Sequence, residues 1–149
     1  MSGIQIREAI ESDFNGIMKL MRQLQPKDPV LEDGRDLKVF QSILAAPNLH
    51  LFALLVDSEI CASTYLNILP NITRSASPYA VIENVVTEED ARGQGFGKMI
   101  MQHTLEFAWV AGCYKAMLMT GSKDESTHAF YRACGFLDDA KTAYLARPC

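Results

Sequence analysis

The spacing of apolar residues along the chain predicts two helices in its first third. Ser12, a residue type that often caps helices, precedes apolar residues that recur at helical spacing up to Leu24, and Pro26 closes the segment. A second stripe with the same spacing runs from Leu37 to Leu44. Each stripe occupies one side of a helix, so we expect both helices to bury that side.

Strand patterns fill much of the remaining chain. The run 49–56 is apolar almost throughout, as in a buried strand, and 60–69 is a longer strand candidate. The other predicted elements are a strand at 4–7, a polar loop at 70–78, a strand at 79–86, a helix from about 97 to 111 that Gly112 ends, a strand at 114–119, a helix at 126–134 and a last strand at 141–146. This order, without linker or repeat, predicts a single α/β (α+β) domain over residues 1–149.

Composition and charge narrow the function classes. The 149 residues carry a formal net charge of −4 and no basic run, so we expect no nucleic-acid partner. No apolar segment approaches the roughly 20 residues that span a bilayer, and the polar start lacks the pattern of a signal peptide. We therefore expect a cytoplasmic protein without a membrane partner. The four cysteines form no CxxC pair, which predicts free thiols and no metal site.

The stretch 79–109 carries the main functional signal. An apolar strand leads through a short acidic loop into the glycine-rich turn RGQGFG, and a helix begins on the last glycine. The first amides of a helix have no partner within it and attract anions, so this order predicts a phosphate site. Gly93, Gly95 and Gly97 alternate, unlike the glycines of the dinucleotide fingerprint. Lys98 is not followed by the Ser or Thr that holds magnesium in nucleotide-triphosphate loops.

Two motifs in this region resemble those of one family. Arg92-x-x-Gly95-x-Gly97 follows the strand 82–86, and the segment FYRACGF lies downstream of it at 130–136. Together they resemble the signature of the GNAT superfamily of N-acetyltransferases, whose second motif reads FYxxxGF. With the run GCYK that precedes the second motif, the C-terminal half is similar to glucosamine-phosphate N-acetyltransferases.

The resemblance implies a mixed, mostly antiparallel sheet of about six to seven strands flanked by about four helices. It also implies acetyl-coenzyme A as the co-substrate, with no metal. The fourth strand would hold the pantetheine arm, provided that the fourth and fifth strands separate there, and the loop amides would hold the pyrophosphate. The cofactor-binding residues expected on this basis are Val85, Val86, Thr87, Arg92, Gly93, Gln94, Gly95, Phe96, Gly97 and Lys98.

The implied reaction is direct transfer of the acetyl group to an amine, without a covalent enzyme intermediate. Glu83, in the strand that would meet the acetyl group, is the expected general base, directly or through a water. Tyr131 matches the tyrosine of FYxxxGF and is the expected general acid for the departing thiolate, because a phenol is protonated at neutral pH. Asp124 departs from the family pattern, since many members carry an Asn there that contacts coenzyme A.

The sequence leaves the acceptor open. We expect a primary amine of a small molecule, such as an amino sugar, an aminoalkyl compound, a polyamine or an amino acid. In the family the first two helices and their loop shape the acceptor site. Arg35 and Arg74 are basic residues that could serve a sugar phosphate. The alternatives are acetylation of protein lysines or N-termini, and a non-catalytic acyl-coenzyme A sensor on the same fold. A homodimer is a further expectation, because dimers are common in the family and the C-terminal strand could contribute.

Overall fold

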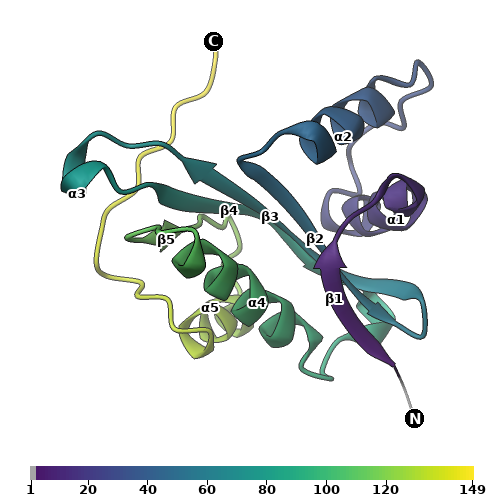
Figure 1. The fold of residues 1–149 in the computed structure, drawn as a ribbon. Coiled ribbons are helices and arrows are strands. Elements are labelled where there is room, and N and C mark those ends of the chain that lie inside the picture. The colour runs from purple at the N-terminus through teal and green to yellow at the C-terminus, as the bar shows by residue number, and fades with distance from the viewer. Residues whose placement is uncertain (1–2) are drawn as a thin grey trace.

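A computed structural model describes residues 3–149, in which five strands form one sheet (Figure 1). Neighbouring strands from β1 to β4 are antiparallel, and β5 runs parallel to β4. A parallel pair needs a crossover connection, and helix α4 (Phe96–Val110) provides it. In sheet order the strands are β1 (Ile4–Glu8), β2 (Leu49–Val56), β3 (Glu59–Leu69), β4 (Tyr79–Thr87) and β5 (Ala116–Met117).

Helices cover the sheet on two faces, which we call the α1/α2 face and the α4/α5 face. On the first, α1 (Phe14–Leu24) packs against β3 and β4, and α2 (Arg35–Ala45) packs against β2. On the second, α4 packs against β2, β3 and β4, and α5 (Glu125–Ala133) lies beside it (Figure 1). The short α3 (Thr73–Ala76) forms the tip of the connection between β3 and β4 (Figure 1).

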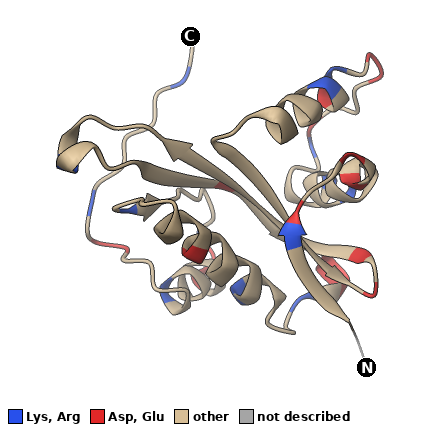
Figure 2. Cartoon of the chain, in the orientation of Figure 1, with Lys and Arg blue, Asp and Glu red and all other residues tan. Residues whose placement is uncertain are grey.

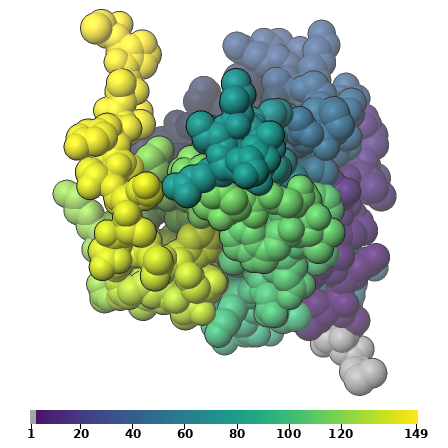
Figure 3. All heavy atoms as spheres, turned by 60° about the vertical axis from the view of Figure 1, so that its left-hand side comes forward, coloured from purple at the N-terminus to yellow at the C-terminus, as the bar shows by residue number. Residues whose placement is uncertain are grey.

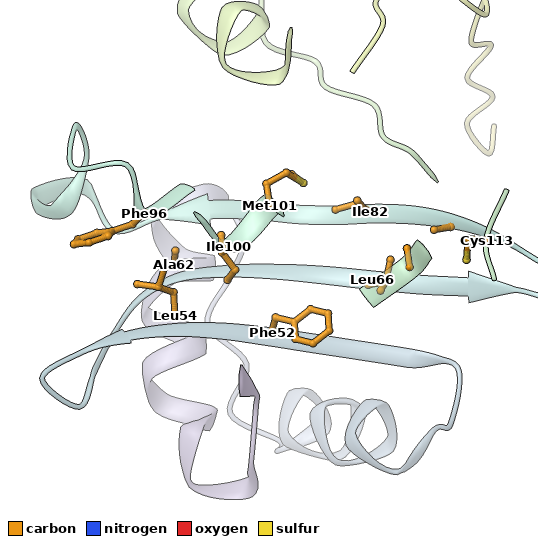
Figure 4. Packing of buried hydrophobic residues seen from close by; sticks show 11 residues of the cluster. Phe52, Leu54, Ala62, Leu66, Ile82, Phe96, Ile100, Met101 and Cys113 are labelled. Carbon is orange, nitrogen blue, oxygen red and sulfur yellow. The ribbon is translucent and has the colours of Figure 1, made fainter. Parts of the chain in front are cut away.

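The two faces bury separate sets of side chains. Along β2, Leu51 and Leu55 pack with the cluster of the α1/α2 face, whereas Phe52 and Leu54 pack with that of the α4/α5 face. Successive side chains of a strand point to opposite faces, so a strand covered on both sides is apolar at nearly every position. The predicted strand 49–56 therefore matches β2. Figure 4 shows the α4/α5-face cluster, with Phe52, Leu54, Ala62, Leu66, Ile82, Phe96, Ile100, Met101 and Cys113 labelled.

The predicted size of the sheet is wrong. Residues 3–149 form five strands rather than six to seven, and five α-helices rather than about four. The predicted strand 114–119 is reduced to Ala116–Met117, and the predicted strand 141–146 is not formed. A strand requires a hydrogen-bonded neighbour, and residues 137–149 are exposed throughout. Within residues 3–149, this segment has no partner strand.

The start of α1 also differs from the prediction, because Ser12 does not cap it. Ser12 lies in a 3₁₀ turn, and Asp13 supplies the stabilising contacts instead. Its Oδ2 accepts hydrogen bonds from Arg7 Nη1 at 2.6 Å and from the backbone N–H of Ile10 at 2.8 Å. The Arg7 guanidinium, helped by the Ile10 amide, lowers the pKa of the Asp13 carboxyl below its ordinary value. The helix therefore begins one residue after this carboxylate, at Phe14.

Charged side chains lie mainly on the helices and loops, and the central sheet carries few of them (Figure 2). Glu83 is the single charged residue of β4. Within the described chain, no helix has both the length and the apolar character that crossing a membrane requires.

Candidate active site

Strand β4 loses its second neighbour early along its length. β5 pairs with it only at Ala80–Ala116 and Val81–Met117. Within residues 3–149, the edge of β4 over Ile82–Thr87 faces no other strand on that side. The backbone groups of an unpaired strand edge can bind an extended ligand. The separation of the fourth and fifth strands that the sequence analysis requires is therefore present.

A bulge shapes this edge of β4. Glu83 pairs with Tyr65 of β3, but the next pair is Val86 with Ser63, so β4 contains one extra residue between them. Asn84 has a φ of 52°, in the left-handed region where non-glycine residues are uncommon. Bulges bend a strand and are frequent beside active sites. Sequence reasoning missed this one, because an asparagine within an apolar strand is its only signal.

The glycine-rich turn leads from this edge into α4. Gly93 and Gly95 have φ values of 82° and 84°, which favour glycine, and open space lies where a side chain would point. In the described chain, none of the backbone N–H groups of 93–98 donates a hydrogen bond. Phe96 is buried in the core and anchors the helix start, while Arg92 and Lys98 are exposed beside it. The turn thus presents unpartnered amides to solvent at a helix N-terminus, which is the arrangement that attracts anions.

A side chain of α1 fixes the acidic loop that precedes this turn. Gln23 Nε2 donates to Glu88 Oε1 at 2.9 Å, and Gln23 Oε1 accepts from the backbone N–H of Glu89 at 2.9 Å. The other oxygen of Glu88 accepts from the backbone N–H of Asp90 at 2.6 Å. The pKa of the Glu88 carboxyl is lowered, and the hydrogen bond from Gln23 contributes most to this shift. Sequence reasoning missed Gln23, since one glutamine on a helix carries no signal of a partner 65 residues away.

Replacing Gln23 with alanine is expected to weaken acetyl-coenzyme A binding about 5- to 30-fold, because two hydrogen bonds of about 1 kcal/mol each position the loop. Calorimetry with coenzyme A measures this directly. Gln25→Ala, an exposed glutamine at the end of the same helix, is the matched control. Equal affinities for both variants and the unmodified protein would show that the loop does not depend on Gln23.

Glu83 lies on the α1/α2 face of β4. Its neighbour Ile82 is buried in the α4/α5-face cluster, whereas its cross-strand partner Tyr65 packs with the α1/α2-face cluster. Residues directly opposite each other on antiparallel strands share a face, so Glu83 and Tyr65 lie side by side. The Glu83 side chain is exposed there. An amine that approaches from the α1/α2 face would meet this carboxylate.

Tyr131 lies on the other side of β4, packed against the α4/α5-face cluster. Helix α5 sits close to the start of α4, since a side chain at Gly97 would come within 3.2 Å of the Phe130 ring. Burial is the main cause that raises the pKa of the Tyr131 phenol, and the Cys134 thiol and the Glu83 carboxylate raise it further. The phenol therefore stays protonated at neutral pH, and it is near enough to Glu83 to sense its charge.

A group of cations and aromatic rings lies at the closed end of the β4–β5 pair. Lys115 Nζ lies 5.2 Å from the centre of the Tyr79 ring and 5.3 Å from that of Tyr114, and the Arg74 guanidinium lies 5.6 Å from the centre of Tyr114. Ala80 is buried in the cluster of the α4/α5 face, so its neighbour Tyr79 points to the α1/α2 face. Tyr79 therefore shares that face with Glu83, which lies about 13 Å away along the strand. Neither Arg74 nor Lys115 forms an ion pair within residues 3–149.

Other candidates from the sequence lie elsewhere or are engaged. Arg35 forms an ion pair with Asp33 at 3.0 Å at the start of α2, and it does not join the cations and aromatic rings around Lys115. Asp124 occupies the cap position of α5, but its side chain makes no capping hydrogen bond. Among the described residues no three His, Cys, Asp or Glu side chains are arranged to hold a metal ion, and the four cysteines are free.

Comparison with known proteins agrees with this geometry. The model of the acetyltransferase (GNAT) family matches residues 15–136. Glucosamine 6-phosphate N-acetyltransferase 1 of Oryza sativa subsp. japonica is 28% identical over 126 residues, which cover 83% of this chain and 74% of that protein. A solved structure provisionally described as an acetyltransferase of Agrobacterium tumefaciens str. C58 is 42% identical, with a TM-score of 0.92 and coverage of 97% of this chain and 99% of that one.

A more distant structure shares the fold alone. It is an aminoglycoside N-acetyltransferase in complex with CoA, 20% identical, with a TM-score of 0.83 over 100% of this chain and 97% of that one.

The family match covers most of the sequence, and the open β4 edge beside a glycine-rich helix start is present in the fold. The chain belongs to the GNAT family of acetyltransferases and is an acetyl-coenzyme A-dependent N-acetyltransferase.

Proposed function

We propose that the protein transfers the acetyl group of acetyl-coenzyme A directly to a primary amine of a small molecule. The observation that carries this proposal is the row of unpartnered amides at 93–98, next to the unpaired edge of β4. Coenzyme A has a diphosphate and an extended, amide-containing arm, and these two features match the two kinds of free backbone group. Acetyl-coenzyme A supplies the activated thioester.

The residues of the site fit this co-substrate. The amides of Gly93, Gln94, Gly95, Phe96 and Gly97 would face the diphosphate, and the exposed cations of Arg92 and Lys98 would add charge. The backbone of Val85, Val86 and Thr87 would bind the pantetheine arm as an additional strand. The open space beside Gly93 and Gly95 leaves room for the phosphates to approach the backbone.

Two side chains on opposite sides of β4 would move the protons. Glu83, on the α1/α2 face, would take a proton from the attacking amine. The amine nitrogen then bonds to the carbonyl carbon, the carbon–sulfur bond breaks, and the thiolate takes a proton from the Tyr131 phenol. The raised pKa of Tyr131 keeps that proton available at neutral pH. Because the base and the acid flank the same strand edge, an acetyl group placed there would lie between them.

The charges on the α1/α2 face, from which the amine would approach, favour a small amine that also bears an anionic group. Arg74 and Lys115 have no ion-pair partner in the described chain, and they share the exposed end of this face with Tyr79. One relative acts on glucosamine 6-phosphate, as its name states, and a structural neighbour acts on aminoglycosides. Of these two kinds of amino sugar, a negatively charged one suits the two cations better than a polycation does.

An amine panel that follows the release of coenzyme A thiol tests the proposal. We expect a small primary amine to be acetylated with a kcat/KM of about 10⁴ M⁻¹s⁻¹ or higher. Glucosamine 6-phosphate is expected to exceed glucosamine by about 10-fold, the size of one charge-assisted contact. Turnover restricted to lysine peptides would favour a protein acetyltransferase. Binding of acetyl-coenzyme A without turnover on any amine would favour a sensor.

A further inference from the structure

A row of three side chains crosses the sheet on the α1/α2 face. Leu51 of β2 pairs with Tyr65 of β3, and Tyr65 in turn pairs with Glu83 of β4. Leu51 is buried in the α1/α2-face cluster, Tyr65 is half-buried against that cluster, and Glu83 is exposed. Side chains directly opposite each other on antiparallel strands have Cβ atoms about 5 Å apart. The Tyr65 phenol therefore lies at the border between the apolar core and the candidate general base.

The hydroxyl of Tyr65 has no hydrogen-bond partner in the part of the chain that the structure describes, unlike the hydroxyls of the two residues before it. Ser63 Oγ donates to the carbonyl oxygen of Phe52 at 2.8 Å, and Thr64 Oγ1 shares a hydrogen bond with Thr104 Oγ1 at 2.7 Å. No buried polar side-chain atom of the described residues lacks a partner, so the free hydroxyl of Tyr65 faces solvent. A tyrosine that buries its ring usually also finds a partner for its hydroxyl. We expect that partner to come from outside the chain.

The backbone on both sides of Tyr65 is held in place. The pair Tyr65–Glu83 is the last regular one before the bulge of β4, and Thr64 lies opposite that bulge. Thr64 and Thr104 are fully buried, and Thr104 Oγ1 also donates to the carbonyl oxygen of Ile100 at 2.7 Å. These two hydrogen bonds tie β3 to α4 beside the tyrosine. The position of the phenol is therefore fixed before a ligand arrives.

The end of the chain does not supply the missing partner. Residues 137–149 are exposed throughout, and two views show them standing away from the body of the protein (Figures 1 and 3). The Glu83 carboxylate forms no ion pair within residues 3–149, and it is not hydrogen-bonded to the Tyr65 phenol. Two polar groups on neighbouring strands thus share one face, and a ligand group can bond to both.

We propose that Tyr65 is a further catalytic residue, whose phenol oxygen accepts a hydrogen bond from the acceptor amine while Glu83 takes the other amine proton. This inference deepens the proposed function and rests on it. A neutral primary amine has two N–H bonds. As the nitrogen bonds to the carbonyl carbon, one proton passes to Glu83 and the other stays in the amide product. With both N–H bonds held, the lone pair is left for the thioester at the edge of β4.

The Tyr65 phenol keeps its own proton during this step. Burial raises the pKa of the phenol above its ordinary value of about 10, so the group is neutral at neutral pH. A neutral phenol oxygen accepts a hydrogen bond but does not compete with Glu83 for the proton. A secondary amine has a single N–H bond, which passes to Glu83, and none remains for Tyr65. Tyr65 therefore distinguishes primary from secondary amines.

Replacing Tyr65 with phenylalanine removes the hydroxyl and keeps the packed ring, and thermal unfolding checks that the fold is preserved. With glucosamine 6-phosphate as the acceptor, we expect kcat/KM to fall about 10-fold, the effect of one hydrogen bond. With its N-methyl derivative, which has no N–H bond to spare, kcat/KM should fall less than about twofold. Tyr144→Phe, at an exposed side chain, should leave both values unchanged. The release of coenzyme A thiol is the measurement.

The double variant Tyr65→Phe/Glu83→Gln gives a second measurement. Both side chains hold the same amine, so the double variant should lose less than about 1,000-fold, the product of a loss of about 10-fold and one of about 10²-fold. Fully multiplicative losses, or equal effects of Tyr65→Phe on the two acceptors, would overturn the role of Tyr65. If the unmodified protein does not acetylate glucosamine 6-phosphate, the proposed acceptor is wrong and this inference fails with it.

Discussion

Replacing Tyr131 with phenylalanine is expected to lower kcat about 10²- to 10³-fold while acetyl-coenzyme A affinity changes less than about twofold. The substitution removes only the hydroxyl and keeps the ring that packs against the α4/α5-face cluster. Without a phenol, the leaving thiolate has to depart as an anion or take its proton from water. Steady-state kinetics gives kcat, and calorimetry gives the affinity.

The pH dependence gives this prediction a second measurement. Burial and two neighbouring groups raise the pKa of Tyr131, so the protonated acid persists to a higher pH than an ordinary phenol, whose pKa is about 10. Loss of rate caused by deprotonation of Tyr131 should therefore begin only above that value in the unmodified enzyme and vanish in the variant. Tyr144→Phe, at an exposed side chain near the C-terminus, is the matched control. A fully active Tyr131→Phe enzyme would place the acid elsewhere.

Replacing Glu83 with glutamine is expected to lower kcat/KM for the amine about 10²-fold near neutral pH, and by less as the pH rises towards the pKa of the acceptor. A primary amine is mostly protonated at neutral pH, so the base is needed most there. Glutamine keeps the size and polarity of the side chain but cannot accept the proton. The full pH profile of kcat/KM for both enzymes is the measurement.

A surface carboxylate on a neighbouring strand provides the comparison. Glu59 at the start of β3 is exposed, and Glu59→Gln should leave the profile unchanged. If the Glu83 variant lost the same factor at every pH, the residue would position the substrate without acting as a base. In that case the proton would leave through another group on the α1/α2 face.

The sequence predicted the parts of the fold in which local pattern and tertiary burial agree. β2 has its predicted bounds because both of its faces are covered, and Gly112, with a φ of 90°, ends α4 where a left-handed residue is needed. The glycine-rich turn was also predictable from local pattern, because its glycines and the helix that follows lie within one short stretch of sequence. Glu83 and Tyr131 lie on either side of one strand edge, and their roles remain predictions.

The features that sequence reasoning missed depend on residues far apart in the chain. Gln23 forms a hydrogen bond with Glu88, 65 residues later in the chain, and the Lys115 ammonium lies over the ring of Tyr79 on the neighbouring strand. The bulge at Asn84 needs a partner strand to be defined at all. Residues 141–146 were predicted as a strand of this sheet from their local pattern, and this is wrong, because they find no partner strand among the described residues.

Calorimetric titration with coenzyme A and with pantetheine tests the central claim, that the amides of 93–98 bind the diphosphate. Pantetheine keeps the thiol arm but lacks the diphosphate and the phosphorylated adenosine of coenzyme A, so competition by pyrophosphate is needed to assign the difference to the diphosphate. We predict that coenzyme A binds at least about 100-fold more tightly, equivalent to about 2.7 kcal/mol, and that inorganic pyrophosphate competes with it. Equal affinities for coenzyme A and pantetheine, without competition by pyrophosphate, would contradict the account.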